Sequence, residues 1–407
     1  MPELLFLTQR IPYPPIKGEK IRPLQILRLL CERYVVHLGS LIDDPADWQH
    51  VPEIQKLCGE TYFASLNPTV ARATCLRGLL SGEPLSVLYF FNRGLSRWVE
   101  GVLARRHPEA AFVCSSAMAQ YLLDRPNRPP RIVMDFADVD SDKWRQYAQR
   151  HRGPKRWIFR RESQLLLAFD RRIGRDFDAS TFVSPAEASL FKKVAPEIAD
   201  KTHFVNSGVD AAYFSPERGY ETPYLGNHPV VVFIGTMNYW PNVDAASWFA
   251  AEMLPRLREA IPDLQFFIVG SHPNAQVREL ASRPGVTVTG RVADVRPYLA
   301  HATAAVVPLR VAGGVQNKVL EAMAMAKPVV ASSRALAGLV PEVAGCALAA
   351  EDPDGFVLAV HRVVEDGEAK SAALALRSRQ AILRFYNWRR NLAAFLPLLG
   401  QRDEVPA

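Results

Sequence analysis

The chain contains 407 residues, which is more than one hydrophobic core usually accommodates, so two domains are expected. Its composition, with 48% hydrophobic and 22% charged residues, is that of a soluble globular protein. Five scattered cysteines without a C-x-x-C pair exclude a disulfide framework and a thiolate zinc site, and the net charge of +7 favours anionic partners such as nucleotides, lipid head groups or nucleic acid.

Short apolar runs rich in Val, Ile and Phe alternate with segments of helical spacing along most of the chain. In the first half these runs lie at residues 3–8, 34–41, 111–116, 131–136, 179–184 and 201–206. In the second half, after a turn-rich linker at 215–229, they lie at residues 230–236, 264–271, 286–290, 304–309, 328–333 and 346–350. This alternation predicts an α/β protein with two Rossmann-like halves, each built on a largely parallel sheet. The first run lacks a basic leader and a cleavage site, so we expect a strand of a cytoplasmic protein.

The expected domains are residues 1–207 and 208–376, followed by a helix at 377–407 that is long enough to reach back to the first domain. In open α/β sheets, ligands bind beyond the carboxyl ends of the strands. Two such sheets facing each other across a cleft would place the residues that follow the strands around a bound ligand.

The stretch "GGVQNKVLEAMAMAKPVV" at 313–330 follows one of these strands and opens a helix expected to run to about Ala326. The glycine pair Gly313–Gly314 lets backbone N–H groups approach an anion, and the helix start adds partial positive charge, so a phosphate fits there. Lys318 would neutralise that phosphate, and Glu321, on the same side of the helix, could accept hydrogen bonds from a ribose diol. The alternative is a flexible helix start with an accidental Lys/Glu pair.

Several segments resemble one known family. These are "NKVLEAMAMAKPVVAS", "FVNSGVDAAYFSP" (204–216), "VVVFIGTMNYWPNVDA" (230–245), "VTVTGRVADVRPYLAHATAAVVPL" (286–309) and "TFVSPAEASLF" (181–191). They are similar to the GT-B glycosyltransferases of the large retaining class related to glycogen and sucrose synthases, often called family 4. Within that class, "VMDFADVDSDKWRQYA" (133–148) and "GTMNYWPN" (235–242) resemble transferases of exopolysaccharide gene systems in bacteria with exosortase sorting.

The resemblance implies a GT-B fold and a hexosyltransferase that moves a sugar from a nucleotide sugar, UDP- or GDP-linked, to a glycan or lipid-linked acceptor with retention. It implies a role in exopolysaccharide or cell-envelope polysaccharide synthesis. The nucleotide sugar is a substrate, so neither a cofactor nor a metal is expected. Front-face attack, with the departing phosphate taking the acceptor's proton, requires no protein nucleophile.

The resemblance also assigns residues to the donor: Glu321 to the ribose, Lys318 to the diphosphate, and both to catalysis. The full donor set is Gly18, Lys20, Gly235, Thr236, Gly290, Arg291, Arg310, Gly313, Gly314, Val315, Gln316, Asn317, Lys318 and Glu321. Three departures from the family pattern accompany it. Gly313 stands where the family has a glutamate that contacts the donor sugar, Gly18–Glu19 replaces a glycine pair, and Arg310 would replace a basic residue expected after residue 236.

A D-x-D pattern, Asp138-Val139-Asp140, follows the strand predicted at 131–136. Metal-dependent transferases of another fold hold Mn²⁺ or Mg²⁺ with this pattern. The alternatives are acceptor contact or catalytic base duty by Asp138, and a capping or surface role. His37, Ser115 and Ser116, predicted to follow other strands, are further candidates for acceptor binding.

The segment 143–175 is rich in Arg and Lys around aromatic residues. It could lie peripherally on an anionic membrane, at the inner face of the plasma membrane, or be a surface helix with solvated arginines. Two other function classes stay open. One is a GT-B nucleotide-sugar epimerase, and the other is a non-enzymatic basic scaffold for membrane or nucleic acid, although no nucleic-acid partner is expected.

Overall fold

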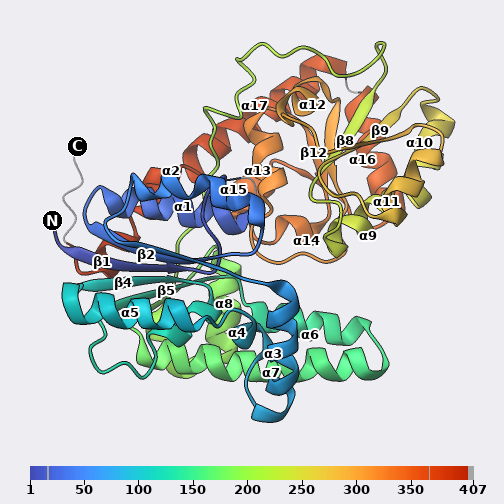
Figure 1. Ribbon diagram of the computed structural model, residues 1–407. Coiled ribbons are helices and arrows are strands. Elements are labelled where there is room, and N and C mark those ends of the chain that lie inside the picture. Colours follow the sequence, from blue (N-terminus) through green and yellow to red (C-terminus); the bar gives the residue numbers. More distant parts are fainter. Residues whose placement is uncertain (16–17, 366, 402–407) are drawn as a thin grey trace. The chain divides into compact units, whose positions relative to one another are not determined.

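The protein is described by a computed structural model of residues 1–15, 18–365 and 367–401 (Figure 1). The chain divides into two compact units. The first unit comprises Met1–Asn206 together with the chain from Leu392 onward, and the second unit comprises Ser207–Asn391. Among the described helices, none combines the length and the apolar character that a bilayer-crossing segment needs.

The first unit is built on a seven-stranded sheet in the order β3-β2-β1-β4-β5-β6-β7, in which all paired strands run parallel. The strands are β1 (Glu3–Thr8), β2 (Val35–Ile42), β3 (Thr61–Ser65), β4 (Ala110–Cys114), β5 (Arg131–Ala137), β6 (Ala179–Phe182) and β7 (Thr202–Phe204). The predicted parallel α/β architecture is confirmed. The edge strand β3 was not predicted, because only one of its five residues is buried and its apolar pattern is weak.

Helices of the first unit connect these strands: α1 (Gly18–Cys31), α2 (Val51–Gln55), α3 (Pro68–Ser81), α4 (Leu85–Tyr89), α5 (Arg93–Arg106), α6 (Asp140–Arg150), α7 (Gly153–Asp176) and α8 (Pro185–Val194). Local sequence explains their starts. For example, the Ser184 hydroxyl accepts the Glu187 backbone N–H at 3.2 Å, and Pro185 occupies the first turn of α8. The core combines strand residues such as Leu5 and Met134 with helix residues such as Leu95 and Ile173, all fully buried.

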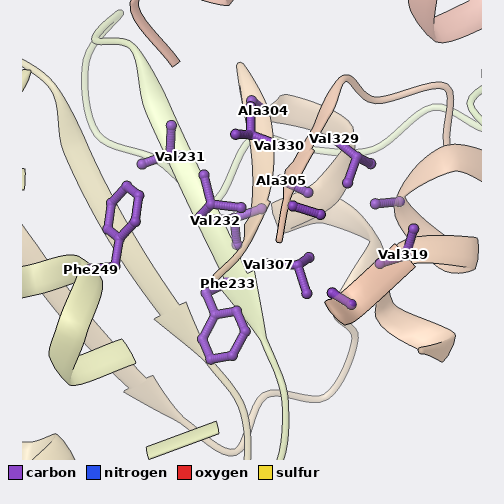
Figure 2. Close-up of a cluster of buried hydrophobic side chains, with 14 of the residues drawn as sticks. Val231, Val232, Phe233, Phe249, Ala304, Ala305, Val307, Val319, Val329 and Val330 are labelled. Atoms are coloured by element: carbon purple, nitrogen blue, oxygen red, sulfur yellow. The ribbon is translucent and has the colours of Figure 1, made fainter. Parts of the chain in front are cut away.

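The second unit is built on a six-stranded parallel sheet in the order β10-β9-β8-β11-β12-β13. The strands are β8 (Val230–Ile234), β9 (Gln265–Val269), β10 (Val286–Gly290), β11 (Ala304–Val307), β12 (Val329–Ala331) and β13 (Leu348–Ala349). The helices are α9 (Trp240–Trp248), α10 (Leu254–Ala260), α11 (Ala275–Glu279), α12 (Arg296–His301), α13 (Asn317–Ala324), α14 (Ser333–Leu336), α15 (Pro341–Ala344), α16 (Pro353–Glu365) and α17 (Gly367–Phe385). Figure 2 shows valines of the central strands packing with Phe233, Phe249 and Val319 in this core.

The segment predicted to be a linker, residues 215–229, contains no strand or helix but packs on the second unit. Its Tyr224 is buried, donates a hydrogen bond to the Tyr298 carbonyl at 2.6 Å, and lies edge-on to Phe267 with 4.6 Å between ring centroids. Aromatic burial therefore makes this segment part of the second unit.

The C-terminal segment, predicted as one helix, is broken into three: α17, α18 (Trp388–Leu392) and α19 (Phe395–Leu398). The break occurs at Asn387, whose side-chain oxygen accepts the Arg390 backbone N–H at 3.0 Å and starts α18. Beyond Asn391 the chain rejoins the first unit, where Phe395 is fully buried. The Phe395 ring lies edge-on to Phe112 at 4.9 Å and beneath the Arg22 guanidinium at 5.5 Å.

We expect Phe395→Ala to lower the free energy of unfolding of the first unit by about 3–5 kcal/mol, because it removes a buried aromatic side chain. Chemical denaturation followed by circular dichroism measures this change. Val70→Ala, at a position with 62% exposure on α3, is the matched control and should change stability by less than about 0.5 kcal/mol. Equal stability of the two variants would contradict docking of the C-terminal segment.

Candidate active site

Glycines terminate three neighbouring strands of the second sheet at its carboxyl edge: Gly235 after β8, Gly270 after β9 and Gly290 at the end of β10. A Cβ on Gly270 would collide with the Gly235 carbonyl, and a Cβ on Gly235 would lie 2.7 Å from the Asn242 side-chain nitrogen. At Gly290, with φ +69°, a Cβ would meet open space. Close packing therefore requires glycine at 235 and 270, and at Gly290 no side chain covers the position of a Cβ, so a ligand could approach the backbone there.

The loop before α13 is fixed by close backbone packing. Gly314 adopts the left-handed region at φ +60°, and a Cβ on Gly338 would collide with the Gly314 carbonyl. The Gln316 side-chain amide donates to the Gly313 carbonyl at 2.9 Å. The helix starts at Asn317, three residues after the glycine pair, and it ends at Ala324 rather than near Ala326.

Lys318, in the first turn of α13, reaches the end of β8. Its Nζ donates to Asn242 Oδ1 at 2.5 Å, and the Asn242 Nδ2 donates to the Thr236 carbonyl at 3.0 Å. The ammonium also lies 4.7 Å from the centroid of the Phe233 ring. The structure thus brings together the predicted residues Gly235, Thr236 and Lys318.

Lys318 and Glu321 are both half-buried, and each lies close enough to the other for their charges to interact. Burial, opposed by the charge of Glu321, lowers the pKa of Lys318 to about 7. Burial, opposed by the charge of Lys318, raises the pKa of Glu321 to about 7. Within the described part of the chain, neither side chain forms a salt bridge. A ligand with an anion for Lys318 and hydroxyl donors for Glu321 would stabilise both charged forms.

The remaining predicted donor residues of this unit differ in their surroundings. Val315, Gln316 and Asn317 are half-buried at the helix start, and Arg291 is exposed. Arg310 is bonded through two nitrogens to the Asp244 carboxylate, one at 2.9 Å, and lies over the Trp248 ring at 5.1 Å. Its guanidinium is therefore held against α9, and its contact with a donor stays a prediction.

Asn242, Asp244, Gly270 and Gly338 were not predicted. Asn242 lies in the "GTMNYWPN" segment that follows the first strand of the second unit. Asn242 could have been predicted from its position, because it is a polar residue on the helix that follows the carboxyl end of a strand.

In the first unit, the predicted donor residues lie at the start of α1. Gly18 is its first residue, and the buried Lys20 donates to Asp47 Oδ2 at 2.6 Å. The ammonium of Lys20 is thus neutralised inside the unit. Next to it, Arg22 forms a buried two-point pair with Asp135 at 2.8 and 2.9 Å.

The expectation that His37 follows the second strand is wrong. His37 is the third residue of β2 and is buried near the strand's amino end. Its Nδ1 accepts the Glu60 backbone N–H at 3.1 Å, and its Nε2 lies 3.1 Å from Glu3 Oε2. Because both ring nitrogens are engaged away from the carboxyl edge, we no longer assign His37 to an acceptor.

Ser115 follows β4 at the carboxyl edge of the first sheet, with φ +76°, and its hydroxyl donates to Gln9 Oε1 at 2.7 Å. Beyond β5, Lys143 Nζ bonds Asp138 Oδ2 at 2.7 Å and Asp140 Oδ1 at 2.9 Å. Against the opposing effect of burial, these carboxylates raise the pKa of Lys143. The D-x-D carboxylates therefore converge on an ammonium in this structure.

Asp170 of α7 is a functional candidate that the sequence analysis missed. It is 2% exposed, and its Oδ1 has no hydrogen-bond partner among the described residues. Burial, opposed by a hydrogen bond with Ser116 and reinforced by the carboxylates of Asp140 and Glu162, raises its pKa to about 8. Glu162, Leu166, Asp170 and Ile173 share one buried stripe of the helix. Asp170 could have been found from the sequence, because it and Glu162 occur at the helical spacing at which buried apolar residues are expected.

Comparisons with known proteins identify a family match in the second unit and similar folds. Residues 228–366 match the family Glycosyl transferases group 1. Among curated proteins, no sequence matches this chain. Among solved structures, the chain is similar to the sucrose-phosphate synthase of Thermosynechococcus elongatus, with 17% identity, a TM-score of 0.70 and 98% of each chain covered.

It is also similar to Anabaena HepE, solved in complex with UDP-glucose, with 15% identity, a TM-score of 0.67 and 98% and 100% of the two chains covered. A third structure is WaaG, a glycosyltransferase involved in lipopolysaccharide biosynthesis, with 15% identity, a TM-score of 0.64 and 96% and 98% covered. The fold is GT-B, and the chain is an enzyme of the glycosyltransferase type.

The raised pKa of Asp170 predicts a pH-dependent stability. The folded protein holds a proton on Asp170 between the unfolded pKa of about 4 and the folded pKa of about 8, so stability declines as pH rises through this window. Asn cannot ionise, so the stability of Asp170→Asn should not decline in this way. When the pH is raised from 5 to 9, the free energy of unfolding of the variant should rise by about 1–3 kcal/mol relative to that of the native protein. Denaturant unfolding at both pH values measures this difference. Asp200→Asn, at an exposed position, should show no such relative gain. If the stability of Asp170→Asn changed with pH just as that of the native protein does, the raised pKa of Asp170 would be contradicted.

Proposed function

We propose that this glycosyltransferase transfers a sugar from a UDP- or GDP-sugar to a glycan or lipid-linked acceptor with retention of configuration. The observation that carries the proposal is that Lys318 and Glu321, on α13, are half-buried and form no salt bridge with any described residue. An anion and a diol together would satisfy these two side chains, and a nucleoside diphosphate contains both. HepE, a similar structure, was solved with UDP and with UDP-glucose.

In this proposal the diphosphate lies at the start of α13. The N–H groups around Gly314 and at the helix start donate hydrogen bonds to its oxygens, and Lys318 donates to a further phosphate oxygen. Glu321, one helical turn further, accepts hydrogen bonds from the ribose hydroxyls. The base would contact the backbone at Gly290 and Arg291, where no side chain fills the space above Gly290.

Departure of the nucleoside diphosphate builds negative charge on the phosphate and positive charge on the sugar ring. Lys318 and the fixed amide dipoles stabilise the developing phosphate charge, and Asn242 holds the lysine in position. With retention by front-face attack, the departing phosphate takes the acceptor's proton, so no protein nucleophile is needed. Gly313 has no side chain to contact the sugar, which leaves the sugar itself unassigned.

We further propose that the first unit binds the acceptor at the carboxyl edge of its sheet. Ser115, Asp138 and Asp140 follow β4 and β5 there, and the positive φ of Ser115 is a strain common at binding sites. Asp138 would contact the acceptor. The alternative, that Asp138 serves as the base in place of the departing phosphate, would require Lys143 to release its carboxylate. The exopolysaccharide or cell-envelope role, on the cytoplasmic side of the membrane, rests on the motifs at 133–148 and 235–242.

Glu321→Ala should weaken UDP binding by at least about 10-fold, because it removes charge-assisted hydrogen bonds to the ribose. It should also abolish donor hydrolysis while leaving the melting temperature within a few degrees. Calorimetric titration with UDP, and a hydrolysis screen over UDP-, GDP- and ADP-sugars, measure these effects.

Glu259→Ala is the matched control, because Glu259 is an exposed carboxylate on α10, which leads to the amino edge of the same sheet. It should bind UDP as the native protein does. Unchanged UDP affinity in Glu321→Ala would refute the ribose assignment. Release of an epimerised nucleotide sugar without acceptor would indicate an epimerase instead of a transferase.

A further inference from the structure

Helices α6 and α7 of the first unit form an antiparallel hairpin, and we call residues 150–160 at its turn the hairpin tip (Figure 1). The sequence from 143 to 161 contains no Asp or Glu. Its basic residues are Lys143, Arg145, Arg150, Arg152, Lys155, Arg156, Arg160 and Arg161. Positive charge is therefore concentrated at one end of the hairpin, where the start of α7 adds its own partial positive charge.

Lys143 and Arg145 are paired with carboxylates of α6 and the residues before it, whereas four basic residues at the turn are not. Arg152, Lys155, Arg156 and Arg160 are exposed, and no carboxylate of the described residues lies within salt-bridge distance of them.

The other end of α7 behaves differently. There Arg171 and Arg175 bond Glu197 at 2.6 and 3.0 Å, and Arg172 bonds Asp124 at 2.6 Å. One helix thus pairs its arginines at one end and leaves them for an external anion at the other.

The hairpin tip also exposes a large aromatic side chain. Trp157 is 58% exposed, whereas Trp144, Tyr147 and Phe159 pack on one another with ring centroids 5.4–6.0 Å apart. The packed rings hold the two helices together. Trp157 remains available, between Arg156 and Arg160 on the first turns of α7.

The hairpin is anchored directly after the tip. The Arg161 guanidinium donates to the Gly78 carbonyl at 2.5 Å and the Glu83 carbonyl at 3.2 Å. The Glu162 carboxylate accepts the backbone N–H groups of Leu85 and Ser86 at 2.7 and 2.8 Å. These contacts hold the first turns of α7, directly after the tip, against the segment 78–86.

We infer that the hairpin tip docks the protein on the surface of an anionic lipid bilayer. Lysine and arginine side chains would pair with lipid phosphates, and Trp157 would enter the head-group layer, which tryptophan favours. A nucleic acid would also attract the charge, but a single exposed tryptophan at the end of a hairpin suits a flat interface better than a groove that follows a strand. The inference goes beyond the proposed function and does not depend on it.

Sedimentation of the full chain with vesicles tests the inference. We expect binding to vesicles of 30% phosphatidylglycerol in phosphatidylcholine, little binding to pure phosphatidylcholine, and loss of binding in high salt. The variant with Arg152, Lys155, Arg156 and Arg160 changed to Gln should bind at least about 20-fold more weakly, since each surface charge contributes several-fold to partitioning. Trp157→Ala should also weaken binding, and lipid should shift the native tryptophan fluorescence to the blue.

A variant of equal charge change is the control: Lys192→Gln, Lys193→Gln, Arg218→Gln and Arg278→Gln, all exposed and all outside α6 and α7. It should retain nearly native vesicle binding, and all variants should keep the native melting temperature. If the control variant lost vesicle binding to the same extent, net charge alone would explain the binding, and the inference would be overturned. Absence of vesicle binding, or binding of single-stranded DNA oligonucleotides with no vesicle binding, would overturn it as well.

Discussion

Parallel pairing of the strands is the constraint on which the candidate donor site of the second unit and the candidate acceptor site of the first unit depend. Because every paired strand in a sheet runs the same way, each must be followed by a crossover, and all carboxyl ends meet at one edge. In the second unit this brings Gly235, Gly270 and Gly290 together, although they are far apart in sequence. The same edge receives the start of α13, which delivers Lys318 and Glu321. In the first unit it gathers Gln9, Ser115 and the D-x-D carboxylates.

Charge compensation separates structural charges from those available to a ligand. Lys20 with Asp47, and Arg22 with Asp135, are buried pairs that satisfy each other inside the first unit. Such pairs fix geometry but leave no charge for a ligand. Lys318 donates to the neutral amide of Asn242 and shares its surroundings with Glu321, so burial moves both pKa values towards neutrality. At the hairpin tip, Arg152, Lys155, Arg156 and Arg160 are exposed and form no salt bridge with a described carboxylate.

The sequence predicted much of this arrangement, and its failures have physical causes. Strands with strong apolar runs were placed within a few residues, whereas the poorly buried edge strand β3 was missed. His37 was misplaced because an apolar run does not show where its strand ends. Arg310 looked like a free cation because Asp244, its partner, lies 66 residues away. Asp170 was hidden in a basic segment whose overall charge masked one buried position.

The sequence by itself determined the alternating α/β pattern, the glycine-rich helix start with Lys318 and Glu321, and the basic segment after Lys143. These follow from local spacing and composition, which neighbouring residues fix. Only the tertiary structure decided which charges are neutralised, which glycines face open space, and where the C-terminal segment packs. Those properties depend on contacts between residues distant in the chain, and burial changes the free energy of a charge far more than its neighbours in sequence do.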